Sequence, residues 1–117
     1  MEIGIEEMRE RYLRVAAASV YDALDAMGYP NQCVSLDIKP VTPTCHIAGP
    51  AFTIRGSREP RYDDDLKRPQ FEDFGLFKAM YEGCIIVINA EVDRYCGHWG
   101  EMMSYSARQH GACRYRT

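Results

Sequence analysis

Apolar side chains recur every three or four positions along residues 1–28, a pattern typical of amphipathic helices. The first predicted helix has an apolar face formed by Ile5, Met8, Tyr12 and Val15. A second helix is predicted to begin at Ser19, because a serine side chain accepts a hydrogen bond from the first unpaired amides of a helix. It should end at Gly28, since glycine adopts the left-handed conformation that closes many helices.

A different periodicity follows between residues 35 and 72. Alternation of apolar and polar residues predicts one short strand over 35–40 and another within 46–55. Pro50 cannot donate a hydrogen bond to a sheet, so it should mark a strand boundary, an edge or a bulge. Residues 56–72 are polar and lack apolar periodicity, which is typical of a loop.

The last third of the chain contains the clearest strand. A short helix is predicted to close near Gly83, and the continuous apolar run Cys84–Asn89 follows it. Continuous runs of this kind are typical of strands covered on both faces. A loop then leads to a final helix over 100–110, for which Gly111 is the expected C-terminal cap. The order of helix, glycine and buried strand predicts an α/β layered domain.

Composition and the absence of long apolar runs favour a globular protein over a membrane-spanning or exported one. The chain has 117 residues, of which 46% are hydrophobic and 26% charged, so one globular domain is expected. Its predicted parts are helices in 1–28, strand and loop segments in 35–72, and a helix-strand-loop-helix segment in 73–111. No apolar run approaches the roughly 20 residues of a membrane span, and the acidic N-terminus does not resemble an export signal. The expectation is a cytoplasmic protein.

The charge balance disfavours nucleic acid as a partner. The 14 Lys and Arg residues are outnumbered by 17 Asp and Glu residues, and the net charge is -3. A broad nucleic-acid interface needs a basic surface, so nucleic acid is not expected as a partner. A membrane is not expected either, because the chain has no apolar run long enough to span one.

Five cysteines, an odd number without a C-x-x-C pair, are expected to be reduced thiols. A zinc site is the alternative, with a possible ligand set of Cys96, His98, His110 and Cys113, although this spacing matches no common zinc motif. The three consecutive aspartates at 63–65 offer a second alternative, a hard-cation site, against the simpler interpretation as a solvated loop.

The most informative stretch lies between the apolar strand and the last helix. Amides in the first turn of a helix have no partners within the helix, and together with the helix dipole they attract anions. We therefore expect a carboxylate or phosphate to be held by the amides of Gly100, Glu101 and Met102. His98 is available nearby as an acid or base, although a solvent-facing histidine is the simpler interpretation.

Several ordered segments of the chain match motifs of a known family. Residues 19–28 resemble the element S-x-x-D-A-L-x-x-x-G, and residues 38–53 resemble I-x-P followed by I-A-G-P-A-x-T. Residues 83–89 are similar to the strand G-D-V-L-V-V-D, and Trp99–Met102 is similar to the loop W-G-E-L. The chain thereby resembles the RraA-like family, which includes the 4-hydroxy-4-methyl-2-oxoglutarate (HMG/CHA) aldolases and proteins historically labelled demethylmenaquinone methyltransferase-like.

The resemblance implies a fold, an assembly and a reaction. The fold is the swivelling β/β/α-type layered domain, assembled as a homotrimer or as a hexamer of two trimers. The reaction is the retro-aldol cleavage of 4-hydroxy-2-oxo acids, a lyase reaction that gives pyruvate and depends on a divalent metal, Mg or Mn. Trp99, Gly100, Glu101 and Met102 match the family's substrate-binding loop, so the implied ligand is a small 2-oxo acid or another carboxylate.

Two departures from the family pattern bear on activity. The later family motif D-G-x-x-R-D, whose arginine binds substrate and whose aspartate holds the metal, does not occur in these residues, and Asn89 stands where the family often has aspartate. No catalytic residue and no metal ligand is therefore assigned, and the chain is expected to be a truncated, N-terminal part of the domain with impaired activity. The alternative is a non-catalytic binding or regulatory protein of the ribonuclease-inhibitor type. A methyltransferase is not supported, because no glycine-rich loop follows the first strand.

Overall fold

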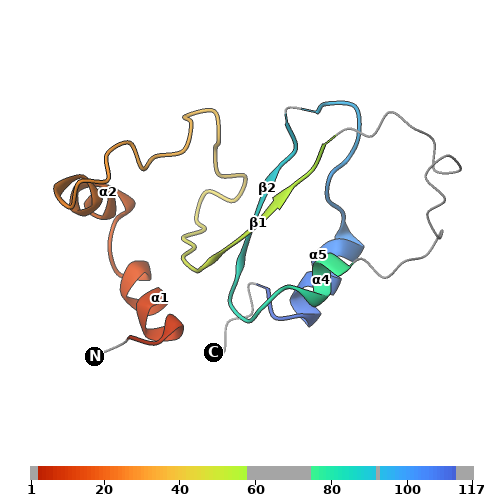
Figure 1. Ribbon diagram of the computed structural model, residues 1–117, viewed down its shortest axis with the longest axis horizontal. Coiled ribbons are helices and arrows are strands. Elements are labelled where there is room, and N and C mark those ends of the chain that lie inside the picture. Colours follow the sequence, from red (N-terminus) through yellow and green to blue (C-terminus); the bar gives the residue numbers. More distant parts are fainter. Residues whose placement is uncertain (1–2, 58–74, 92, 113–117) are drawn as a thin grey trace, which may run out of the picture. The chain divides into compact units, whose positions relative to one another are not determined.

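The computed structural model describes residues 3–57, 75–91 and 93–112. Its elements are α1 (Ile5–Leu13), α2 (Ala17–Ala26), β1 (Ala51–Arg55), α4 (Gly75–Lys78), β2 (Ile85–Asn89) and α5 (Glu101–Gln109) (Figure 1). The chain divides into two compact units, Met1–Gly49 and Pro50–Thr117. Among the described residues, none of the helices has the length and apolar character that a bilayer crossing requires.

The first unit contains the two predicted helices, with one boundary misplaced. Helix α2 has Ala16 as its N-cap, and Ser19 already donates its amide to the Ala16 carbonyl at 3.0 Å. The predicted cap at Ser19 is therefore wrong, because the alanines before it, the best helix formers, extend the helix toward the N-terminus.

The predicted end of α2 is confirmed. Gly28 has a φ of 88°, and its amide donates to the carbonyl of Asp25 at 3.0 Å. The next amide, of Tyr29, reaches back to Leu24 at 2.9 Å. This pair of hydrogen bonds is the Schellman closure, which satisfies carbonyls that the helix leaves unpaired.

The strand predicted over 35–40 is absent from this described segment. Its central residues form a turn, in which Ile38 donates its amide to the Ser35 carbonyl at 3.0 Å. The Ser35 hydroxyl also accepts a hydrogen bond from the Asp37 amide at 3.2 Å. Serine and aspartate side chains compete with sheet pairing in this way, so the alternating pattern here is not a strand.

The second unit is built on a parallel pair of strands. β1 and β2 pair in register from Ala51↔Ile85 to Arg55↔Asn89. The Pro50 carbonyl accepts a hydrogen bond from the Ile85 amide at 2.8 Å, and β1 begins at the next residue, so the predicted strand boundary at Pro50 is confirmed. A parallel pair requires a long crossover connection, and α4 lies within it.

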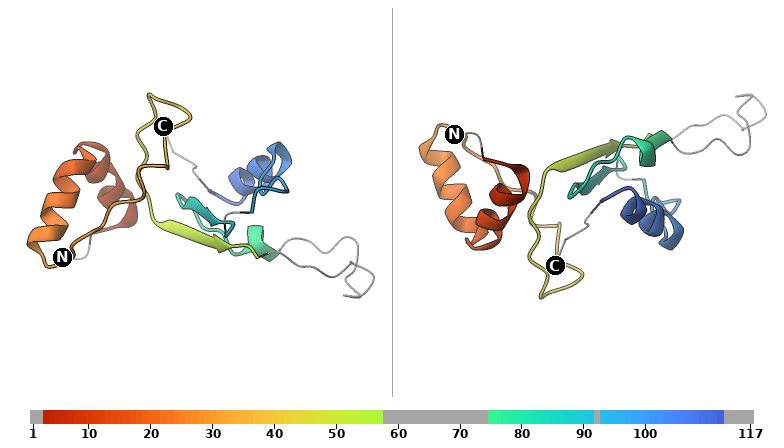
Figure 2. Two further views of the ribbon diagram at one scale, coloured as in Figure 1. Left: turned by 90° about the horizontal axis from the view of Figure 1, so that it is seen from above. Right: turned by 90° about the horizontal axis from the view of Figure 1, so that it is seen from below.

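A small core lies between one face of this sheet and the helices. Its buried residues are Phe77, Met80, Cys84, Ala107 and Ala112. α5 lies beside the two strands in both views of Figure 2, and partly buried side chains of both strands pack against the core. The opposite face is more open, since Val87 is 48% exposed. Among the described residues, β2 is therefore covered on one face only, not on both as its apolar run predicted.

Two glycines join the end of α5 to the start of β2. Gly111 has a φ of 97° and follows the helix as its C-terminal closure, as predicted. Its carbonyl accepts a hydrogen bond from the amide of Gly83 at 2.9 Å, and Gly83 itself has a φ of 76°. A Cβ atom at Gly111 would lie only 2.9 Å from the Cα atom of Glu82. The close backbone approach therefore requires glycine at 111.

Candidate functional site

The start of α5 is exposed at the surface of its unit. Gly100 is the N-cap in an extended conformation, with no side-chain capping hydrogen bond, and the first helical bond runs from the Ser104 amide to the Gly100 carbonyl at 3.0 Å. No described residue accepts a hydrogen bond from the amides of Gly100, Glu101 or Met102. Both Glu101 and Met102 are exposed. We call these three amides the cradle.

The tryptophan that precedes the cradle anchors it. The indole Nε1 of Trp99 donates to the Ser104 hydroxyl at 2.8 Å, and that hydroxyl donates to the Gly100 carbonyl at 3.1 Å. The Trp99 ring also packs edge-on against Phe77, with ring centroids 6.2 Å apart. The only polar atom of this side chain is thus engaged inside the protein. Trp99 therefore acts on the cradle by fixing where the helix begins.

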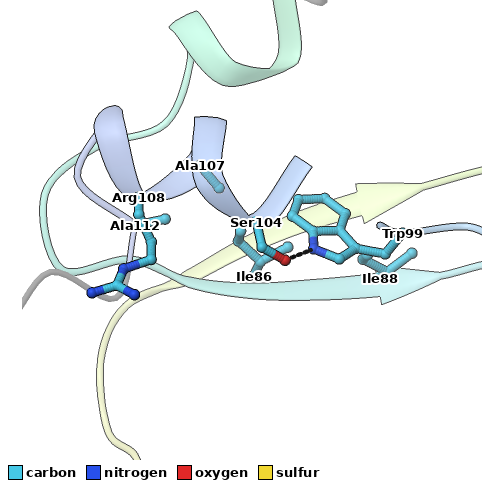
Figure 3. A pocket seen from close by; sticks show the side chains of 7 residues that line it. All are labelled: Ile86, Ile88, Trp99, Ser104, Ala107, Arg108 and Ala112. Atoms are coloured by element: carbon cyan, nitrogen blue, oxygen red, sulfur yellow. Dashed lines mark hydrogen bonds between the residues drawn. The ribbon is translucent and has the colours of Figure 1, made fainter. Parts of the chain in front are cut away.

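An apolar hollow of about 330 Å³ lies beside the helix start. Ile86 and Ile88 of β2 are among its lining residues, as are Trp99 and Ser104, which lie next to each other and are joined by their hydrogen bond (Figure 3). Arg108 supplies a cation at its edge. The cradle residues do not line this hollow, so the two features are separate.

Asn89, which stands where the family often has aspartate, makes a hydrogen bond within its own turn. Its side-chain oxygen accepts a hydrogen bond from the Glu91 amide at 3.0 Å, where Glu91 has a positive φ of 50°. Glu91 in turn accepts from Nε of Arg55 at 2.8 Å. Asn89 thus stabilises the turn that leaves β2.

The four-ligand zinc alternative is wrong. His98 precedes α5, whereas His110 is its C-cap, and a helix of nine residues is about 14 Å long. His110 also bonds through Nδ1 to the Ser106 carbonyl at 2.8 Å. These two histidines cannot share an ion, and Cys113 lies outside the described residues, as do the aspartates at 63–65.

Asp93 is the potential metal ligand that lies beside Cys96 and His98. The ligand atoms of Asp93, Cys96 and His98 lie within 4.8 Å of one another. The sequence prediction missed Asp93, although the spacing D-x-x-C-x-H was a usable signal.

The described part of the second unit is thus an α/β unit with an open helix start that is suited to a small anion. A model of the RraA-like family, described as Aldolase/RraA, matches residues 17–113. The chain belongs to the RraA-like family, as its motifs predicted. No curated protein and no solved structure matches the chain. Both the cradle and the loop before it lie within the matched region.

Proposed function

We propose that the chain binds a small carboxylate, of the 2-oxo acid class, at the cradle. The observation that carries this proposal is the set of three consecutive amides at the start of α5 for which no described residue is an acceptor. Family membership supports the ligand class. A hydrogen bond to a charged group contributes about 1.5–3 kcal/mol, and the helix dipole adds about 0.3–1 kcal/mol near the N-terminus. Such a set suffices for weak, selective binding of an anion.

The reaction in this proposal is the retro-aldol cleavage of a 4-hydroxy-2-oxo acid to give pyruvate. In the family, a divalent Mg or Mn ion, when bound, would supply Lewis-acid chemistry for this cleavage. The described residues do not fit such an ion, because Mg prefers oxygen ligands and the one group of potential ligands found among them includes a thiol and an imidazole. We therefore infer that these 117 residues alone bind the acid and cleave it weakly. The layered β/β/α fold and a trimeric assembly belong to the same proposal.

The cradle can be tested by removing one amide. Glu101 is the first residue of α5, where proline is tolerated, and the extended conformation of Gly100 suits a residue before proline. Glu101→Pro should weaken pyruvate binding about 10- to 100-fold, measured by isothermal titration calorimetry. The matched control Glu101→Gln keeps the amide and removes a negative charge, so it should bind pyruvate at least as tightly as the natural chain. Equal affinities of the two variants would refute the cradle.

Activity is a separate measurement. Pyruvate release from a 4-hydroxy-2-oxo acid, followed with added magnesium through a coupled dehydrogenase, should be slow compared with that of an RraA-like aldolase that carries the D-G-x-x-R-D motif. Turnover at the same rate would contradict the inference that the missing arginine and aspartate matter. Binding of the acid with no cleavage at all would favour the non-catalytic alternative.

A further inference from the structure

The loop between β2 and α5 gathers three side chains whose atoms bind transition metals. The Cys96 sulfur lies 3.1 Å from Oδ2 of Asp93 and 3.9 Å from Nδ1 of His98. In a tetrahedral zinc site, with bonds of about 2.0–2.3 Å, neighbouring ligand atoms are roughly 3.3–3.5 Å apart. The two observed separations bracket this value. Small side-chain rotations would therefore complete a three-ligand site.

The aspartate of this group is held in place by the loop itself. The Asp93 amide donates to the Ala90 carbonyl at 3.0 Å, and Oδ1 of Asp93 accepts from the Tyr95 amide at 2.9 Å. The Asp93 side chain is only 15% exposed. Because one carboxylate oxygen is used by the backbone, the other is directed at Cys96. The loop thus orients its oxygen donor before any ion binds.

The histidine is oriented in the way that metal ligands usually are. Nε2 of His98 lies 3.1 Å from the backbone carbonyl oxygen of Asp93. A carbonyl can only accept, so this contact assigns the ring proton to Nε2 and leaves the lone pair of a neutral ring on Nδ1. Nδ1 is the atom nearest the Cys96 sulfur. A metal-binding histidine commonly donates its other ring N–H to a carbonyl in this manner.

We propose that Asp93, Cys96 and His98 bind a divalent ion of the zinc class. Thiolate and imidazole ligands favour such ions over Mg or Mn, so this site is distinct from the metal site implied by the family. Binding replaces the thiol proton of Cys96, which leaves to solvent, and forms a metal–thiolate bond. One thiolate, one carboxylate and one neutral imidazole together balance the charge of the ion.

The position of the group indicates how the ion would be used. All three residues line a cavity of about 340 Å³, whose wall also includes Gly56, Ser57 and Ala90. Three protein ligands with a fourth position open are the arrangement of reactive zinc sites, whereas structural sites have four protein ligands. The fourth position would hold water or a small anionic ligand from the cavity.

Cobalt(II) is the probe for this site, because a cobalt–thiolate bond absorbs in the near ultraviolet and tetrahedral cobalt absorbs in the visible. The full chain should take up one cobalt ion with both bands, and zinc should displace it. Cys96→Ser should abolish the thiolate band, and His98→Gln should weaken cobalt binding at least about 10-fold. The matched control is Cys45→Ser, which removes an exposed thiol of the other unit and should leave both bands intact.

Proton release gives a second measurement of binding that does not depend on the cobalt absorption bands. Zinc binding at neutral pH in weak buffer should release about one proton per ion from the natural chain and from Cys45→Ser, but none from Cys96→Ser. Circular dichroism of each variant shows that it is folded. A thiolate band that persists in Cys96→Ser, a band lost equally in Cys45→Ser, or a natural chain without the band at millimolar cobalt would each overturn the proposal.

Discussion

Replacing Gly111 with alanine tests the junction that positions α5. The residue has a φ of 97°, a conformation that costs an L-amino acid about 1–2 kcal/mol. The added methyl group would also meet backbone atoms of Glu82, at 2.9 Å from Cα and 3.2 Å from N. Backbone atoms cannot rotate away as a side chain can, so the junction must shift.

The magnitude follows from these two costs. Overpacking of a close contact typically costs about 1–3 kcal/mol, so Gly111→Ala should lower the free energy of unfolding by about 2–5 kcal/mol in total. Gly83 offers a matched control within the same unit. It has a φ of 76°, but a Cβ atom there would meet nothing within 4 Å. Gly83→Ala should therefore cost only the conformational part, about 1–2 kcal/mol.

Urea unfolding followed by far-ultraviolet circular dichroism measures both variants. The midpoints should shift in the order natural chain, Gly83→Ala, Gly111→Ala, with similar slopes if the denatured state is unchanged. The difference between the two variants isolates the contact with Glu82. If Gly111→Ala is no less stable than Gly83→Ala, the close approach at Glu82 is wrong.

Two further predictions concern hydrogen bonds at helix starts. Trp99→Phe and Ser104→Ala each remove the same 2.8 Å hydrogen bond, so a double-mutant cycle of the two in urea unfolding should show a coupling free energy of about 1 kcal/mol. Additive effects on the free energy of unfolding would mean that the bond contributes nothing. Ala16 is an N-cap without a side-chain hydrogen bond, so Ala16→Ser should raise the free energy of unfolding by about 1 kcal/mol. Ser19→Ala should change the free energy of unfolding far less. The reverse order of effects would restore Ser19 as the N-cap.

Local signals predicted the elements that depend on local chemistry. Gly28 and Gly111 were identified as helix ends because a positive φ next to an apolar periodic segment is a property of a few neighbouring residues. The same holds for β2, whose apolar run is continuous, and for Pro50 as a strand boundary. The start of α5, and with it the cradle, was predictable for the same reason.

The predictions that failed concern side chains that compete with strand pairing, or residues whose separation in space the sequence does not show. At 35–40 the alternating pattern was correct, but the Ser35 side chain formed a turn that no periodicity reveals. The zinc alternative chose His110 by residue type and overlooked the helix that separates it from His98. Asp93 was missed although it lies only three positions before Cys96, because the zinc prediction considered cysteines and histidines alone as ligands; the structure places its carboxylate beside the Cys96 sulfur.

The buried thiol of Cys84 has a practical consequence. Its residue is 0% exposed, whereas Cys33, Cys45 and Cys96 are exposed. An alkylating reagent reaches Cys84 only when the packing between the sheet and its helices opens, so the rate of its modification reports the free energy of that opening. Alkylation of Cys84 therefore measures local opening of the core at the residue just before β2.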